Sequence, residues 1–154
     1  MRVGLGFDAH AFDSARPLVL GGVVVPDSPG LAGHSDADVL SHALADALLG
    51  AAALGDLGSM LVPTEAWRDA SSLAILASSV AAARDAGWEL VNADVTVIAE
   101  RPRLGPHRAE MVARVAEALG AEAGVVSVKA TTTDGLGFTG RGEGIAAIAV
   151  VLLE

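Results

Sequence analysis

The sequence predicts a two-layer α/β sandwich with a mixed four-stranded sheet, helices on one face and a small β-hairpin, a ferredoxin-like arrangement. Strand-like and helix-like segments follow one another as β-ββ-α-α-β-α-β-β. Because they alternate only in part, a mixed sheet is favoured over a doubly wound one. The chain has 154 residues, 52% of them apolar, with no repeat and no linker. We therefore expect a single domain over residues 1–154 with a full core.

The strands are predicted from short runs rich in β-branched and other apolar residues. The hairpin is predicted because two such runs flank the Gly21-Gly22 pair, a dipeptide typical of tight turns. In order, the expected strands are 2–7, a pair within 17–26, 89–98, 125–131 and 144–153.

Three segments are predicted to be helices: 36–53, 70–86 and one that begins at Pro106 and ends before Gly120. The first helix has the clearest start signal. Ser35 is a natural N-cap, and Asp38 completes a Ser-x-x-Asp capping pattern. Residues 54–69 lie between the first two helices and are expected to form a loop.

The charge of the chain argues against two classes of partner. Ten basic and nineteen acidic residues give a net charge of −9, which disfavours nucleic acids and anionic membranes. No apolar run reaches the roughly 18 residues that a membrane helix needs. The start, MRVGLGFDAH, has no secretory signal pattern, so we expect a cytoplasmic protein. Cysteine is absent, which excludes disulfides and thiolate metal sites.

Two histidines and an aspartate are candidate metal ligands. Asp8 and His10 lie two apart at the end of a predicted strand, so their side chains point to the same face. His42 lies on the first helix, whose polar stripe consists of Ser35, Asp38, His42 and Asp46. Two imidazoles and one carboxylate are a common ligand set for catalytic zinc, with the fourth position open.

Plainer interpretations of the same residues stay open. Asp-x-His alone is a weak metal motif, Ser35 with Asp38 is often only a helix cap, and His42 with Asp46 fits a surface pair at i,i+4. A metal-bound histidine usually donates a hydrogen bond from its second ring N–H to a partner. If His42 binds a metal, we expect Asp38 or Asp46 to be that partner.

Two further segments have the composition of ligand-binding loops. Residues 129–144, KATTTDGLGFTGRGEG, combine threonine hydroxyls with glycines that let backbone N–H groups approach phosphate. They contain no Walker A sequence, and a plain hairpin loop explains the composition equally well. Residues 99–107, AERPRLGPH, form a basic connection with prolines, for which an ordinary β–α loop is the simplest interpretation.

Three segments carry a resemblance to a known family. GFDAHAF at 6–12, GHSDADVLSHALADALLGAAALGDLG at 33–58 and VKATTTDGLGFTGRGEGIAA at 128–147 resemble the 2-C-methyl-D-erythritol 2,4-cyclodiphosphate synthases, with the match running along the whole chain. The resemblance implies a lyase of the non-mevalonate isoprenoid pathway. Its substrate would be 4-diphosphocytidyl-2-C-methyl-D-erythritol 2-phosphate, whose 2-phosphate attacks the β-phosphate in line to give the cyclic diphosphate and CMP. It also implies a homotrimer with active sites between subunits.

The resemblance assigns roles to residues that match the family's motifs. Asp8, His10 and His42 would hold one zinc ion per subunit, and Asp134 would support a second ion, Mg²⁺ or Mn²⁺. His34 and Thr132 would stabilise the developing charge. The residues implied to bind substrate are Ser35, Asp56, Gly58, Glu65, Ala99, Glu100, Arg103, Leu104, Gly105, Thr131, Thr133, Phe138 and Arg141.

The sequence departs from the family pattern at two places. Residues 59–72 read SMLVPTEAWRDASS, where the family has Phe-Pro-Asp-x-Asp and a later Lys-x-x-Asp-Ser. Asp134 stands where Glu is usual. These departures keep a second hypothesis open, a trimer that binds zinc and cytidine nucleotide with reduced or lost turnover. A third, a zinc-dependent phosphoester hydrolase, is disfavoured by the Thr-Thr-Thr-Asp and Gly-Asp-Leu-Gly segments.

Overall fold

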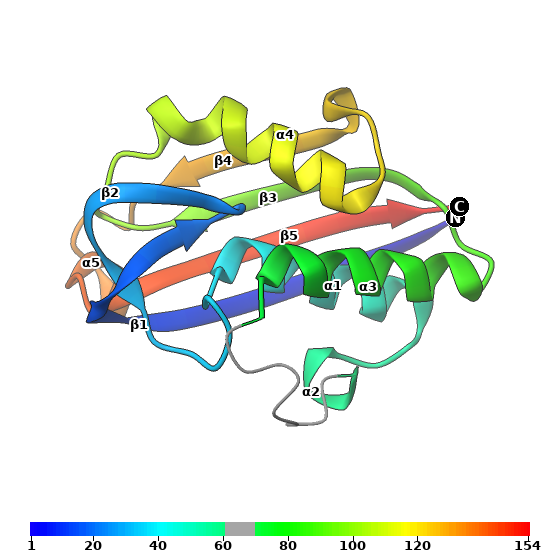
Figure 1. The fold of residues 1–154 in the computed structure, drawn as a ribbon, viewed down its shortest axis with the longest axis horizontal. Helices are drawn as coiled ribbons and strands as arrows, with labels where there is room; N and C mark the ends of the chain where they lie inside the picture. The colour runs from blue at the N-terminus through cyan, green and yellow to red at the C-terminus, as the bar shows by residue number, and fades with distance from the viewer. Residues whose placement is uncertain (61–69) are drawn as a thin grey trace.

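A curled five-stranded sheet with one layer of helices forms the fold in the computed structural model, which describes residues 1–60 and 70–154 (Figure 1). The sheet order is β2-β1-β5-β3-β4. Strands β3 and β4 are parallel, and the other neighbouring pairs are antiparallel, so the sheet is mixed as predicted. The strands are β1 (Arg2–Leu20), β2 (Val23–Leu31), β3 (Leu90–Ile98), β4 (Val126–Thr131) and β5 (Gly144–Leu153).

The three long helices lie on one face of the sheet (Figure 1). In the described part of the chain the helices are α1 (Val39–Ala52), α2 (Leu57–Met60), α3 (Ser72–Asp85), α4 (Arg108–Leu119) and α5 (Gly137–Gly140), with 3₁₀ turns at Gly105–His107 and Ala123–Val125. Helix α1 packs on β1 and β5 with one side and on α3 with the other, so most of its residues are buried. No helix in the described ranges is long and apolar enough to cross a membrane.

The expected hairpin is part of the main sheet, so the sheet has five strands and not four with a separate hairpin. Strand β1 pairs with β5 along Arg2–Ala11 and then with β2 along Phe12–Leu20. The expected strand 2–7 was too short because the following residues, DAHAFDSAR, mix polar side chains with alanines and so lack the β-branched pattern that marks a strand. The turn at Gly21-Gly22 forms as predicted, with φ of +55° and +73°.

The start of α1 differs from the prediction. The helix begins at Val39, and its N-cap is Asp38, whose carboxylate accepts the N–H of Ser41 at 3.2 Å. The same carboxylate accepts the N–H groups of Gly21 and Gly22 at 2.9 and 2.8 Å, which ties the β1–β2 turn to the helix. Ser35 is not the cap, since Ala37 has a φ of +56° and interrupts any helix before Asp38.

Two glycines let α1 lie directly on β1. A Cβ atom at Gly4 or Gly6 would stand 1.9 Å from the carbonyl oxygen of Ala47 or Ala43, respectively. Only glycine allows this approach, because any side chain would overlap the helix backbone. Asp8 follows Gly6 on the same face of the strand and therefore lies under the first turn of α1.

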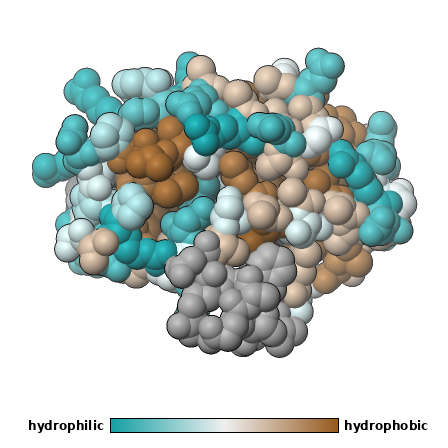
Figure 2. Space-filling view, in the orientation of Figure 1, coloured by the Kyte–Doolittle hydropathy of each residue, from teal (hydrophilic) through white to brown (hydrophobic). Residues whose placement is uncertain are grey.

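The two faces of the sheet differ in what covers them. Figure 2 shows the helix-covered face, with hydrophilic side chains along its rim. On β1 and β5, apolar side chains that alternate with the buried ones are 39–69% exposed in the single chain: Val3, Leu5, Phe7, Ile148 and Val150. An exposed apolar patch on a β-sheet is typical of a surface that binds another protein.

Candidate active site

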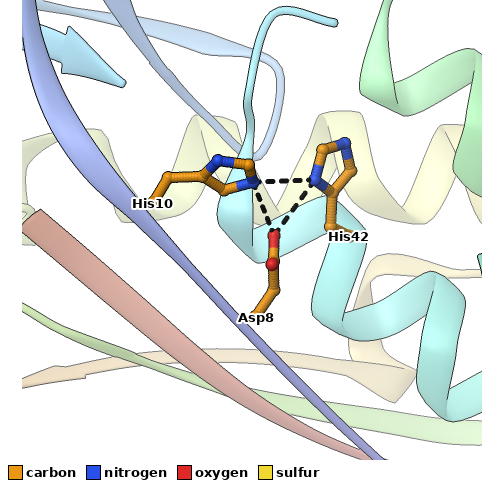
Figure 3. A group of neighbouring side chains, drawn as sticks. All are labelled: Asp8, His10 and His42. Carbon is orange, nitrogen blue, oxygen red and sulfur yellow. Dashed lines mark hydrogen bonds and ion pairs between the residues drawn. The ribbon is translucent and has the colours of Figure 1, made fainter. Parts of the chain in front are cut away.

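Asp8, His10 and His42 converge as the sequence predicts (Figure 3). Strand β1 supplies Asp8 and His10, and the first turn of α1 supplies His42. Asp8 Oδ2 lies 2.9 Å from His10 Nε2 and 3.0 Å from His42 Nδ1. The two ring nitrogens are 3.3 Å apart. We call these three residues the metal triad.

The spacing of the triad fits a tetrahedral metal ion. Zinc bonds of about 2.0–2.2 Å place two ligand atoms of a tetrahedron about 3.3–3.6 Å apart. The triad atoms are 2.9, 3.0 and 3.3 Å apart, so shifts of a few tenths of an ångström suffice to accept the ion. The other ring nitrogen of His10, Nδ1, faces the carbonyl oxygen of Ala32, which only accepts, so that nitrogen carries the proton and Nε2 offers a lone pair.

Contacts within the triad shift the pKa values of Asp8 and His10. Burial alone would raise the pKa of the Asp8 carboxyl, but hydrogen bonds and charges from His10 and His42 hold its pKa well below the usual range. The hydrogen bond to Asp8 raises the pKa of His10, against the opposing effect of desolvation. Asp8 is therefore a full anionic ligand at neutral pH, and a proton competes with any cation at His10.

The partner of the second His42 nitrogen is not the one predicted. Asp38 binds the β1–β2 turn, and Asp46 Oδ1 accepts the N–H of Leu57 at 2.8 Å. His42 Nε2 instead lies 3.2 Å from the hydroxyl of Ser35 and 2.9 Å from that of Ser72. Sequence reasoning did not connect Ser72 with His42, because the two lie 30 residues apart and no helix or strand spacing relates them.

The loop from residue 32 to residue 38 presents His34 and Ser35 next to the triad. His34 is exposed and Ser35 is buried. The guanidinium of Arg16 donates to the carbonyl oxygens of Gly33 and Ser35, on either side of His34. Arg16 therefore fixes the backbone that presents the His34 imidazole.

The loops after β3 and β4 are joined by one carboxylate. Glu100 Oε1 accepts the N–H of Thr133 at 3.0 Å and that of Gly135 at 3.4 Å. Within residues 99–105, Arg101, Arg103 and Gly105 are exposed, Ala99 is half-buried against the core, and Leu104 is buried as their anchor. The two segments that the sequence singled out as separate ligand loops thus form one surface.

Asp134 sits at the exposed tip of this surface. Its φ is +52°, and its Oδ1 accepts the hydroxyl of Thr132 at 3.1 Å. Thr131, the last residue of β4, is exposed as well. Oxygen atoms from Thr132 and Asp134 face solvent together, which suits a hard divalent cation.

The remaining predicted residues lie in three places. Asp56 and Gly58 flank the start of α2, where Asp56 Oδ1 accepts the N–H of Ser59 at 2.7 Å. Phe138 is 40% exposed on α5, and Arg141 donates to Glu143 at 2.6 Å. Glu65 lies outside the described residues.

The triad lies at the same end of the sheet as the loops after β3 and β4, residues 99–105 and 131–135, but on other elements. Ala146 of β5 pairs with Ala9 on one side and with Ile98 on the other. Strands β1 and β4 are three positions apart, about 14 Å at the usual strand spacing. Among the described residues, no hydrogen bond or ion pair joins the triad to residues 99–105 or 131–135.

Along its whole length the chain is similar to one group of proteins. It matches the YgbB family over residues 1–154. It is 57% identical to 2-C-methyl-D-erythritol 2,4-cyclodiphosphate synthase of Moorella thermoacetica, over 99% of the chain and 94% of the relative, and 56% identical to that of Salinibacter ruber, over 100% and 99%.

Solved structures agree with the sequence relatives. A CDP-bound structure of 2C-methyl-D-erythritol-2,4-cyclodiphosphate synthase superposes with a TM-score of 0.91 at 34% identity, covering 99% of this chain and 100% of that one. The bifunctional IspDF of Campylobacter jejuni gives a TM-score of 0.94 at 42% identity, covering 99% of this chain and 42% of the other. With its triad, its loops and its full-length match, the chain belongs to the YgbB family, the 2-C-methyl-D-erythritol 2,4-cyclodiphosphate synthases.

Proposed function

We propose that the chain converts 4-diphosphocytidyl-2-C-methyl-D-erythritol 2-phosphate into 2-C-methyl-D-erythritol 2,4-cyclodiphosphate and CMP. The observation that carries the proposal is the metal triad, in a chain 57% identical to a synthase of that name. In the reaction an oxygen of the 2-phosphate bonds to the β-phosphorus, and the bond from that phosphorus to the bridging oxygen breaks. CMP leaves with the electron pair, so no nucleophilic side chain is required.

Asp8, His10 and His42 would hold one zinc ion per subunit. When bound there, zinc supplies Lewis-acid polarisation of a phosphate oxygen. The chain's own contribution is to keep the Asp8 carboxylate and one nitrogen of each imidazole aimed at one point. The fourth position stays open to a phosphate because the triad offers three ligands and no fourth.

His34 and Thr132 are the proposed donors to the charge that develops during the transfer. His34 is exposed on a loop whose backbone Arg16 fixes, so its imidazole is free to meet a substrate oxygen. Thr132 stands beside Asp134 on the loop after β4. Preorganised donors of this kind lower the barrier most when they need no rearrangement.

The remaining residues are proposed to bind the substrate. Residues 99–105 would hold cytosine mainly through backbone groups, and Asp56 with Gly58 would contact the ribose. Thr131 and Thr133 would bind the nucleotide phosphates, with Asp134 supporting Mg²⁺ or Mn²⁺. Ser35, Phe138, Arg141 and, outside the described residues, Glu65 complete the proposed contacts. A structural relative bound to CDP supports a cytidine diphosphate group as the recognised part.

We further infer a homotrimer with each site shared between two subunits. The apolar side chains exposed on β1 and β5 give the chain a face for association. Strand β1 lies about 10 Å from β3 and about 14 Å from β4 across the sheet, so a neighbour's loops can complete the site over the triad. The proposal includes a cytoplasmic location, because substrate and product are highly charged phosphates.

Release of CMP tests the function directly. Protein stripped of metal with a chelator should release none, and addition of zinc and Mg²⁺ should restore release. Conversion of His42 to Ala should abolish both zinc binding and CMP release. Zinc at wild-type content in that variant would contradict the assigned ligands, and release without added metal would contradict the metal dependence.

A further inference from the structure

Ser72 and Asp36 form a connection behind the metal triad. Ser72 is the first residue of α3 and is fully buried. Its hydroxyl oxygen lies 2.9 Å from His42 Nε2, and the hydroxyl donates to Asp36 Oδ1. Asp36 Oδ2 also accepts the N–H of Ser72 at 3.1 Å. A carboxylate, a hydroxyl and an imidazole thus follow one another in a line that ends at the triad.

With a cation bound by the triad, the protons in this line have one consistent arrangement. The Asp36 carboxylate only accepts, so the hydroxyl hydrogen of Ser72 goes to Asp36. The Ser72 oxygen then offers lone pairs to His42 Nε2, which must carry the ring proton and donate it. When a cation lies between Asp8, His10 and His42, the Nδ1 lone pair of His42 is therefore directed at that cation.

The nearby Ser35 hydroxyl fits the same arrangement without replacing Ser72. Its oxygen accepts the N–H of Ala37 at 3.1 Å, and it lies 3.3 Å from the Ser72 oxygen. The Ser35 hydrogen therefore has Ser72 as an acceptor. Ser72 then accepts two hydrogen bonds and donates one, which is the full capacity of a hydroxyl.

We propose that Asp36 and Ser72 are positioning residues that keep His42 in the Nε2–H form and orient its ring for metal binding. This inference rests on the metal site of the proposed function and adds a tautomer-setting pair to it. Metal-bound histidines commonly donate to a carboxylate directly, and losing that partner typically costs 10–100-fold in metal affinity. Here a serine hydroxyl stands between the ring and the carboxylate.

A purely structural role must be separated from this one, because Asp36 also caps the N-terminus of α3. Asp36→Asn serves that purpose. Its amide oxygen still accepts the N–H of Ser72 and only the long contact from the N–H of Asp38, 3.3 Å, is lost. Its NH₂ donates to the Ser72 hydroxyl and turns that hydrogen toward His42 Nε2. The ring proton then moves to Nδ1, the wrong nitrogen for the metal.

The variants are Ser72→Ala and Asp36→Asn, with Ser79→Ala as the matched control. Ser79 is another fully buried serine of α3, and its hydroxyl donates to the carbonyl oxygen of Ile75 at 3.0 Å, within its own helix. All three variants lose or alter one buried hydroxyl interaction on the same helix. Thermal unfolding checks that each is folded.

Zinc affinity, measured by competition with a chromophoric chelator, is expected to fall about 10–100-fold in Ser72→Ala and Asp36→Asn and to stay within about twofold in Ser79→Ala. Nitrogen-15 NMR of the metal-free imidazoles should show a larger share of the Nε2–H form of His42 in the wild type than in Asp36→Asn, because Asp8 favours a proton on Nδ1 equally in both. If Ser72→Ala does not fold, Asp36→Asn decides the matter alone.

Wild-type zinc affinity in both variants, or an unchanged His42 tautomer in Asp36→Asn, would overturn the positioning role. A wild-type protein that binds no zinc would instead remove the metal site of the proposed function. The two failures are distinguishable because the tautomer is read from the metal-free protein.

Discussion

Asp8 Oδ2 lies within 3.0 Å of one nitrogen from each of two histidines, one on its own strand and one on a helix 34 residues later. The strand pair follows from the i,i+2 spacing that any reader of the sequence can recognise. The partners of His42 Nε2 do not follow from spacing. Asp46 lies at the helical i+4 position from His42, yet its carboxylate is taken by the N–H of Leu57. Sequence spacing therefore predicted the three ligands, whereas the hydrogen-bond partners of the ligands depend on tertiary contacts.

Zinc binding should weaken as the pH falls. The hydrogen bond to Asp8 raises the pKa of His10, and a protonated imidazole cannot bind a metal. Below the raised pKa, each zinc must displace one proton, so affinity should drop about tenfold per pH unit; above it, affinity should level off at His10. Chelator competition at several pH values measures the curve.

Asp8→Asn is the informative comparison for that curve. Without the carboxylate, the pKa of His10 should fall. The pH at which zinc affinity levels off should then move lower, while zinc affinity falls at every pH. If zinc affinity levels off at the same pH in both proteins, the influence of Asp8 on the pKa of His10 is contradicted.

Asp134→Asn should raise the Mg²⁺ concentration needed for half-maximal activity about tenfold. The reason is the loss of one full negative charge from an exposed oxygen cluster beside Thr132, since interactions with a charged group contribute about 1.5–3 kcal/mol. Zinc content should stay unchanged, because the triad lies on β1 and α1. An identical Mg²⁺ dependence would assign Asp134 to the loop conformation alone.

At the scale of elements, the contact between β1 and α1 positions the site. Gly4 and Gly6 place the helix backbone directly on the strand, so that His42 reaches Asp8. The helix also begins later than its capping pattern indicates, because Ala37 adopts a positive φ. The Asp38 carboxylate caps the helix and also accepts the N–H groups of the β1–β2 turn. Neither effect can be predicted from residue spacing. Spacing indicates which residues share a face of an element, but not which neighbouring element packs on that face.

Gly6→Ala should lower both stability and zinc affinity. Its Cβ would stand 1.9 Å from the carbonyl oxygen of Ala43, next to His42 in the helix, so α1 must move away from the strand. Overpacking of this kind costs about 1–3 kcal/mol of unfolding free energy. Denaturant unfolding and chelator competition measure the two effects.

Gly50→Ala is the control for that substitution. Gly50 is an exposed glycine of α1, and a Cβ atom added there would meet no other atom within 4 Å. Alanine should therefore stabilise the helix by up to about 1 kcal/mol. Equal zinc affinity in wild type and Gly6→Ala would show that the close approach of α1 is not needed for the site.

At the scale of the whole molecule, helices cover one face of the sheet (Figure 1). The other face bears exposed apolar side chains. The mixed α/β fold and the order of its elements were predictable, because hydrophobic patterning and turn residues mark each element. The continuous sheet was not, since the polar residues that carry the site interrupt the apolar pattern of β1 between Phe7 and Leu18.

Leu5→Asp should dissociate the proposed trimer. Leu5 is 69% exposed in the single chain and central to the apolar face, where a buried unpaired carboxylate is costly. Arg108→Asp, on the outer side of α4, adds the same acidic group away from that face and should leave the assembly intact. Light scattering reports the mass of each protein. A wild-type monomer at micromolar concentration would contradict the trimer.

The proposed cyclisation is tested most sharply by phosphorus-31 NMR of the zinc-loaded protein with Mg²⁺ and the cytidyl substrate in ¹⁸O-labelled water. We predict a cyclic diphosphate and CMP, neither carrying ¹⁸O, because the attacking oxygen belongs to the substrate's own 2-phosphate. Unchanged substrate would indicate a binding protein without turnover, and linear phosphates labelled with ¹⁸O would indicate a hydrolase. Either result would contradict the proposed reaction.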